Sequence, residues 1–545
     1  MATLTALVVL AALGAVGALL AGAGEGPRAD ADRRRAVWTL AATGLGLALL
    51  RALFAASRLT RSVDEYGYLS MARHADAQGL GPFDLPWLRL HQLLYSLDGG
   101  RSFWLADVLT SAAVGLSGVL LGWLVWRWTH DRGASVATAA LYVLGLLPFH
   151  GLSSNAEPWA NLGLALYLVV RLNPTGSPTS AVRCLRAGAA LGLAALAKEQ
   201  AAVFVLVEPV ALAFLAPRAG VRVLARGLAC AAAGWWIAVG AFGLLWWVLG
   251  DPAPYLERLH GFALGAGAPE TGVTQVQELE RYTTLPRYLR YGALVVERLG
   301  IPLLANAVLV LAAWGALAQR RAAPRLVAGL VALAAVGLLT ASIGLRWSLH
   351  YFMLLLPAAA PLAGLELRAL LARARGGPRL RRVGATATLG AGIALALGTG
   401  WLLVSDPSLA TGSVSDRATR TQRRALAHRL QAITAPDAPV FVAGWRPELY
   451  VLADRAPASP AVSGGILALD DVLVDLERTP PAAVVLVGGI ALPSFRCSEG
   501  RVWEVHTASD LLSQDPAFLA WLDAQGYARH RGLPILIRGE PEKAE

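Results

Sequence analysis

The stretch FWLADVLTSAAVGLSGVLLGWLVW, residues 103–126, decides the fold of this chain, and Asp107 is the only charged residue in it. A hydrocarbon core about 30 Å thick needs about 20 apolar residues in one helix. Lipid offers no hydrogen-bond partners, so the backbone of such a run must satisfy itself as a helix. We therefore expect residues 103–126 to cross a membrane.

Similar runs recur on both sides of this stretch. Hydrophobic residues make up 56% of the chain and charged residues 16%, whereas soluble proteins carry about a quarter charged residues. The sequence predicts an all-α polytopic membrane domain over 1–404, with about twelve transmembrane helices, because the charge deficit is confined to that part. The other expected spans lie near 3–22, 36–56, 134–150, 156–172, 187–197, 201–216, 227–249, 293–318, 326–345, 350–370 and 383–404. The spans 187–197 and 201–216 are short and could instead form a re-entrant hairpin.

The net charge of +11 does not indicate nucleic acid, because the arginines cluster in short segments between alternate spans. Those segments hold roughly twice as many basic residues as the opposite set, which the positive-inside rule assigns to the cytoplasm. We expect a multi-pass protein of the cell membrane with both termini outside the cytoplasm. The first run could also be a signal peptide cleaved near Ala21-Gly22-Ala23, but it lacks a positive start, so we expect a retained helix.

Residues 405–545 have an ordinary composition and predict a small extracytoplasmic α/β domain. Apolar runs at 439–444, 482–488 and 534–538 read as strands, and 415–433 and 515–526 read as helices. This domain contains no phosphate-binding glycine motif, zinc-ligand spacing or nucleophile elbow. The three cysteines Cys184, Cys230 and Cys497 fit neither a disulfide framework nor a metal quartet.

The first candidate site is SVDEYGY, residues 62–68, at the start of a long outer loop. Ser62 with Glu65 three residues later is the pattern of a helix capping box. A cap needs only one acid, however, and here Asp64 and Glu65 stand together at a membrane surface. Catalysis and capping therefore stay open as alternatives for this pair.

Further charged residues fall on the same side of the predicted membrane. Glu157 precedes a proline in a tiny outer turn, and Lys198 is the only lysine before Lys543. The plain interpretations are a helix-start residue for Glu157 and a snorkelling side chain for Lys198. The functional interpretation of Lys198 is a point charge for a lipid phosphate.

The sequence RWSLHY, residues 346–351, forms a short outer turn. Anchoring at the interface explains Trp347 and Tyr351, but it does not explain Arg346 beside His350. Asp107, Glu208 and Glu297 also fall in or near spans, where acids indicate function or buried pairing. Acids and histidines on the outer side could ligate a divalent metal ion, although no regular ligand spacing occurs; the histidines are His74, His91, His150, His260 and His350.

Taken in order, these motifs resemble the membrane glycosyltransferases of the GT-C type. Within that superfamily the chain is most similar to the protein O-mannosyltransferase and aminoarabinose-transferase group, the family 39 type. The resemblance covers roughly residues 57–460. It rests on Asp64-Glu65-x-x-Tyr68, Asn155-Ala156-Glu157-Pro158, Gly192–Lys198, His350-Tyr351 ahead of Leu354-Leu355-Leu356-Pro357, and Trp445-x-Pro447-Glu448-Leu449-Tyr450 followed by Ala453–Pro457. The family usually has one span before the acidic loop and this chain has two, which puts the role of the first span in doubt.

The resemblance implies a sugar donor carried on a polyprenyl phosphate and an inverting transfer to an extracytoplasmic lipid, glycan or protein. It implies Asp64 as general base, Glu65 and Glu157 orienting the acceptor or a divalent metal ion, and Lys198 and Arg346 stabilising phosphate charge. Tyr68, His350 and Tyr351 are expected to bind substrate. The expected partners are the donor and membrane lipids, not nucleic acid.

Two other classes of function compete with this expectation. A secondary transporter or lipid flippase would place its charges near the bilayer midplane, often between internal repeats. In this chain most charges lie toward one face and no repeat is visible. A non-catalytic envelope assembly subunit would use the C-terminal domain for docking.

Overall fold

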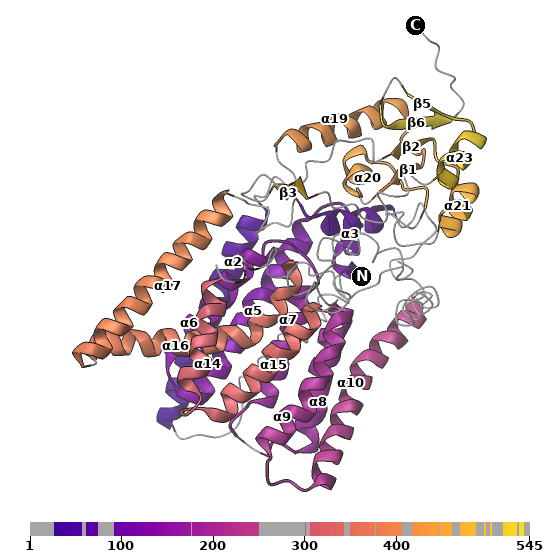
Figure 1. The fold of residues 1–545 in the computed structure, drawn as a ribbon. Coiled ribbons are helices and arrows are strands. Elements are labelled where there is room, and N and C mark those ends of the chain that lie inside the picture. The colour runs from indigo at the N-terminus through magenta and orange to yellow at the C-terminus, as the bar shows by residue number, and fades with distance from the viewer. Residues whose placement is uncertain are drawn as a thin grey trace, which may run out of the picture.

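The computed structural model consists of a helical bundle with a small mixed domain seated on one end (Figure 1). We call this the domain-facing end of the bundle and the other the far end. The described residues are 27–56, 61–74, 92–175, 177–249, 300, 303, 306–342, 349–376, 378–405, 417–444, 446–459, 469–486, 495–496, 502–503, 516–530 and 533–538. The expected span at 3–22 lies outside them.

In the described part, seven helical segments are long and apolar enough to cross a membrane, so the chain is a multi-pass membrane protein. They are α2 (Pro27–Ala56), α5 (Trp104–Thr129), α6 (Arg132–Leu146) with η2 (Leu147–Phe149), α10 (Val221–Leu249), α15 (Pro324–Ser342), η5 (Leu349–Leu355) with α16 (Leu356–Gly376), and α17 (Arg379–Ser405). The four other expected spans are shorter helices. These are α7 (Glu157–Arg171), α8 (Ala181–Ala197), η3 (Glu199–Leu206) with α9 (Val207–Leu215), and α14 (Ala307–Gln319).

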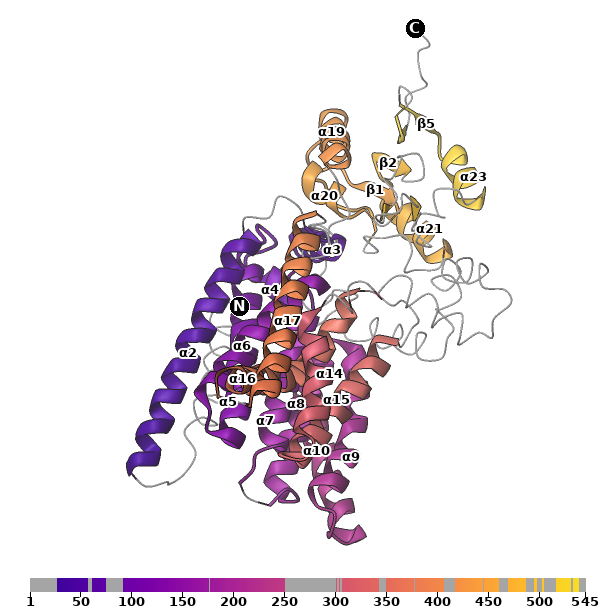
Figure 2. The same cartoon turned by 60° about the vertical axis from the view of Figure 1, so that its left-hand side comes forward.

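Helix α5, which contains residues 104–126 of the long apolar stretch, is the central helix of the bundle. It is buried over most of its length, whereas α10 and α17 are mostly exposed. In Figure 2, α17 lies in front of the other helices of the bundle. Small residues bring helices close together, as membrane bundles require. A Cβ atom at Gly115 of α5 would lie 2.6 Å from the carbonyl oxygen of Gly44 in α2. The exposed apolar faces of α10 and α17 are suited to lipid.

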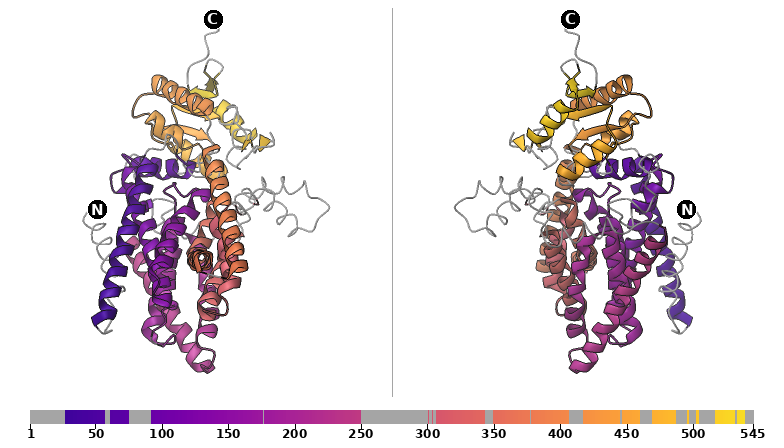
Figure 3. Two further views of the ribbon diagram at one scale, coloured as in Figure 1. Left: turned by 90° about the vertical axis from the view of Figure 1, so that its left-hand side faces the viewer. Right: turned by 90° about the vertical axis from the view of Figure 1, so that its right-hand side faces the viewer.

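The arginine-rich segments lie together at the far end, away from the C-terminal domain (Figure 3). Arg132 pairs with Asp32 there at 2.6 Å, and Arg368 with Asp131 at 2.8 Å. Helix α8 is longer than the 187–197 run predicted. The Ser180 side chain accepts a hydrogen bond from the backbone N–H of Arg183 and caps the start of the helix. The helix therefore begins before arginines that were predicted to lie in a loop.

Two short helices follow α2 at the domain-facing end, α3 (Val63–His74) and α4 (Gln92–Ser96). Helix α3 lies between the bundle and the C-terminal domain (Figure 1). Residues 250–292 lie outside the described residues.

The C-terminal domain contains a mixed four-stranded sheet in the order β1-β2-β6-β5. Strands β1 (Val440–Ala443) and β2 (Ala483–Leu486) are parallel, whereas β6 (Ile535–Arg538) runs antiparallel to β2 and to β5 (Tyr527–Arg529). The three predicted strands and the two predicted helices, α19 (Arg417–Ile433) and α23 (Pro516–Ala524), are present. The sequence analysis missed α20 (Glu448–Ala453), α21 (Leu469–Arg478), β5 and the short pair β3 (Phe495–Arg496) and β4 (Val502–Trp503).

Candidate functional site

A tight turn over residues 150–156 joins η2 to α7 at the domain-facing end. Arg51 of α2 holds this turn with two charged hydrogen bonds, from Nε to the Gly151 carbonyl and from Nη2 to the Ser153 carbonyl, both 2.8 Å long. The Tyr95 hydroxyl donates to the Ser154 carbonyl at 3.1 Å. Hydrogen bonds from a charged donor are stronger than neutral ones, so the turn is fixed before any ligand arrives.

Glu65 forms the capping box that its spacing from Ser62 suggested. Its Oε2 accepts the Ser62 backbone N–H at 2.9 Å, and the Ser62 hydroxyl accepts the Glu65 N–H at 3.2 Å. The other carboxylate oxygen, Oε1, accepts the Ser154 N–H at 3.0 Å and lies 3.7 Å from Arg61 Nη1. The buried carboxylate therefore caps α3 and ties it to the 150–156 turn.

Asp107, in the first turn of α5, is likewise paired. Arg61 Nη1 donates to both carboxylate oxygens at 2.8 and 2.6 Å, and the Ser154 hydroxyl donates to Oδ1 at 2.7 Å. We call Arg61, Glu65, Asp107 and Ser154 the closed cluster, because each charged group in it is matched by a partner within the protein. Buried charges are tolerated when they are paired and hydrogen-bonded in this way.

A second cluster forms on the other side of the same turn. Glu157 is the first residue of α7 and is fully buried. Lys198 Nζ lies 2.9 Å from its Oε1 atom, and His350 Nε2 lies 3.8 Å from the same oxygen. Lys198 Nζ also lies 4.8 Å from the centre of the Tyr351 ring. We call Glu157, Lys198, His350 and Tyr351 the open cluster.

Local backbone structure brings these distant residues together. Lys198 adopts an extended conformation between α8 and η3, so its side chain leaves a junction of two helices. The Asn161 side-chain amide of α7 donates to the Met353 carbonyl at 3.0 Å, which holds η5 and its residues His350 and Tyr351 against α7. Three segments therefore converge on one carboxylate.

The open cluster retains unused capacity for a ligand. Glu157 Oε2 is buried and accepts no hydrogen bond from the described residues. The ring of His150 stacks at a tilt on that of His350, with centroids 5.7 Å apart. His150 has a φ of 62°, a left-handed conformation that is uncommon for residues other than glycine. The ammonium, two imidazoles and phenol can donate hydrogen bonds to an anionic ligand, and Glu157 Oε2 can accept one from a ligand hydroxyl.

The remaining predicted site residues are placed as follows. Asp64 belongs to the first turn of α3, but its side chain lies outside the described residues, as does all of Arg346. Tyr68 of α3 packs against the Tyr95 ring at a centroid distance of 5.7 Å and contacts the core of the C-terminal domain. The structure thus brings Glu157, Lys198, His350 and Tyr351 together and places Glu65 and Tyr68 on the neighbouring helix.

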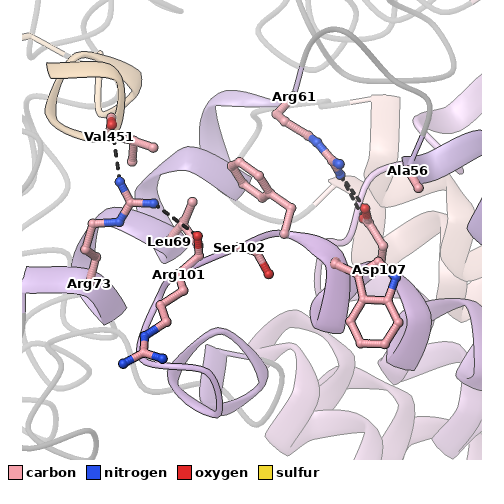
Figure 4. A pocket seen from close by; sticks show the side chains of 10 residues that line it. Ala56, Arg61, Leu69, Arg73, Arg101, Ser102, Asp107 and Val451 are labelled. Atoms are coloured by element: carbon pink, nitrogen blue, oxygen red, sulfur yellow. Dashed lines mark hydrogen bonds and ion pairs between the residues drawn. The ribbon is translucent and has the colours of Figure 1, made fainter. Parts of the chain in front are cut away.

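A groove of about 390 Å³ runs beside the closed cluster, between α3, the start of α5 and α20 (Figure 4). The Arg61–Asp107 pair forms one wall and the Arg73 guanidinium another. Trp104, the first residue of α5, is exposed beside this groove. The groove is lined by Ala56, Arg61, Leu69, Arg73, Arg101, Ser102, Phe103, Trp104, Asp107 and Val451.

Glu208, which also falls within a predicted span, has a structural role. Glu208 of α9 pairs with the fully buried Arg171 at the end of α7, and it also accepts a hydrogen bond from the Tyr167 hydroxyl at 3.1 Å. Glu297 lies outside the described residues. Among the described side chains, no three histidine, cysteine or acidic groups lie close enough to share a metal ion.

Arg51, Arg61 and Tyr95 were not predicted as parts of this region. Arg51 carried a usable signal, because an arginine inside an apolar span indicates a buried partner. The sequence itself gave no sign that Arg61 pairs with an acid 46 positions away.

No protein-family model and no curated protein matches the sequence. Solved structures are similar to the chain at low sequence identity. ArnT from Cupriavidus metallidurans bound to undecaprenyl phosphate matches with a TM-score of 0.49 and 15% identity, over 80% of this chain and 87% of ArnT. The oligosaccharyltransferase of Archaeoglobus fulgidus in its apo form matches with a TM-score of 0.49 and 13% identity, over 84% and 70%.

Proposed function

We propose that this chain is a membrane glycosyltransferase that moves a sugar from a polyprenyl-phosphate donor to an acceptor outside the cytoplasm. The observation that carries the proposal is the buried Lys198 ammonium of the open cluster, paired with Glu157 at the end of a membrane bundle. An ammonium in this position can counter the charge of a lipid-borne phosphate. Together with the ordered motif resemblance, this favours a lipid-phosphate donor.

The proposed reaction is an inverting displacement. The acceptor oxygen bonds to the anomeric carbon of the sugar, while the bond from that carbon to the phosphate oxygen breaks. The acceptor proton passes to Asp64, which acts as general base, and the polyprenyl phosphate leaves without a general acid. Asp64 suits this role because it lies in the first turn of α3. Glu65 connects this helix to the 150–156 turn.

Lys198, His350, Tyr351 and Arg346 are the proposed phosphate-binding residues. Donors that are already in place stabilise charge developing on a leaving group without reorganisation. Glu157 orients the Lys198 ammonium and reduces the cost of burying it. In the orientation that we propose, the far end with its arginines faces the cytoplasm, so donor and acceptor meet on the opposite side.

The test uses the full chain in lipid nanodiscs with an undecaprenyl-phosphate-linked radiolabelled sugar and an envelope extract as the source of acceptor. We expect labelled product and free undecaprenyl phosphate from the wild type. Asp64→Asn should transfer sugar about 100- to 10,000-fold more slowly, the usual contribution of a general base. Glu477→Gln changes an exposed acid of the C-terminal domain and should leave the rate unchanged.

The same preparation separates an enzyme from a transporter. Counter-flow of the lipid-linked sugar across proteoliposomes without chemical conversion would contradict the proposed transfer and support a flippase. A wild-type rate in folded Asp64→Asn would remove that residue from the base role.

A further inference from the structure

Helix α3 packs between two hydrophobic cores. Leu69 packs with Tyr95 and Ala106 of the bundle. Met71, two positions later and on another face of the helix, belongs to the core of the C-terminal domain with Leu426 and Leu449. One short helix therefore joins the bundle to the domain.

Polar contacts fix the C-terminal end of α3 to both sides. Arg73 Nε donates to the Gly100 carbonyl of the bundle at 3.0 Å, and its Nη1 atom donates to the Val451 carbonyl of α20 at 3.3 Å. The same guanidinium lies 3.5 Å from Asp454, just after α20. In Figure 4 the Arg73 side chain reaches from α3 toward Val451.

The N-terminal end of α20 approaches the first half of α3. A Cβ atom at Gly67 would meet the Pro447 ring at 3.8 Å, an ordinary contact distance. Glu448 follows Pro447, is buried, and pairs with Arg423 of α19 at 2.9 Å. Burial raises the pKa of the Tyr66 hydroxyl of α3, and the carboxylates of Glu448 and Glu65 raise it further. The carboxylates of Glu448 and Glu65 thus both act on this tyrosine.

From these contacts we propose that the C-terminal domain positions the candidate site. Pro447 and Val451 contact Gly67 and Arg73 of α3, and the Glu448–Arg423 pair holds α20 within the domain. The connection runs from α20 to α3, then from Glu65 to the Ser154 N–H, and so to the turn that precedes Glu157. Only the activity measurement below rests on the proposed function. The structural measurement tests the connection by itself.

The experiment measures hydrogen exchange of the full chain in nanodiscs for peptides covering 62–74 and 150–158. Removing one partner of a buried ion pair is strongly destabilising, and local opening sets the exchange rate of the amides it exposes. Glu448→Arg should therefore raise exchange in both peptides about tenfold, and adding Arg423→Glu should restore most of the protection. Glu477→Arg makes the same charge change on the exposed side of α21 and should change neither peptide.

Peptides covering β1 and β2 report whether the domain itself stays folded. If Glu448→Arg also exposes that sheet, Met71→Ala decides the question, because it removes a contact from the α3 side and leaves the residues of the domain intact. Raised exchange in 62–74 with a protected sheet supports the proposal. Unchanged exchange in 62–74 overturns it.

Transfer kinetics supply a readout that a purely structural contact would not give. Displacing α3 moves Asp64, whereas Lys198 is held between α8 and η3, and His350 and Tyr351 lie in η5. Glu448→Arg should therefore lower kcat about tenfold with little change in the donor KM, since lost transition-state alignment appears in kcat. If the wild type transfers no sugar but the exchange pattern holds, the proposed function fails and the positioning role stands.

Discussion

The closed and open clusters lie on the two sides of one turn, and each contains acids that the sequence singled out. In the closed cluster, Arg61 donates hydrogen bonds to both carboxylate oxygens of Asp107. The Glu65 carboxylate accepts hydrogen bonds from two backbone N–H groups. In the open cluster, Glu157 holds one ammonium and keeps an oxygen that no described residue satisfies. The comparison separates carboxylates whose oxygens are satisfied within the protein from one with an oxygen that can still accept a hydrogen bond from a ligand.

The largest expected effect is on the open cluster. Lys198→Met removes the proposed phosphate-binding charge and should reduce transfer about 100- to 1000-fold, the cost of losing a donor that stabilises developing charge. It also leaves Glu157 buried without its ion-pair partner. Transfer assays together with thermal unfolding in nanodiscs measure both consequences.

The double variant Lys198→Met with Glu157→Gln separates these consequences. Removing both charges should recover much of the stability, because a buried pair can often be replaced without net loss, while transfer stays low. Recovery of transfer in the double variant would mean that Lys198 serves the fold alone.

The next effect concerns the closed cluster. Arg61→Met leaves Asp107 buried and unpaired and should lower the free energy of unfolding by about 3–5 kcal/mol. Adding Asp107→Leu should recover most of that loss, as measured by thermal unfolding. Transfer per folded molecule should stay within about threefold of wild type in the double variant. The pair stabilises the fold, and kcat/KM falls only when stabilisation of the transition state is lost. A much deeper loss would place this pair in the chemistry and erase the distinction between the clusters.

The smallest effect comes from Glu65→Gln. Glutamine serves in capping boxes as glutamate does, so the variant should lose about 1 kcal/mol of stability, the typical value of a helix cap. Transfer by the folded variant should change little. A loss as deep as that of Lys198→Met would instead support the catalytic role that the family resemblance implies for Glu65.

The sequence predicted a multi-pass membrane body, because apolar length is a property of local stretches. The Ser62–Glu65 cap was also foreseeable, since both partners lie within one turn. The pairing of Arg61 with Asp107 was not, because which side chains meet across 46 residues depends on how α3 packs on α5. Helix α20 escaped notice for a related reason, since its 6 residues are too few to show a helical period.

Lys198 and Glu157 were each predicted as candidates, but not as partners. Their meeting depends on the extended backbone at Lys198 and on the way α7 and α8 pack together. A Cβ atom at Gly163 of α7 would lie 2.7 Å from the backbone nitrogen of Ala194 in α8. Such close packing of small residues determines how far one helix is shifted along the other. Hydropathy alone does not specify this shift.

Equilibrium binding of undecaprenyl phosphate to nanodisc-embedded protein tests the central claim most directly. The wild type and the Arg61→Met/Asp107→Leu variant should bind it with similar Kd. The Lys198→Met/Glu157→Gln variant should bind at least about tenfold more weakly, as expected when about 1.4 kcal/mol of interaction is lost. Equal binding by all three proteins would contradict the assignment of the open cluster as the phosphate site.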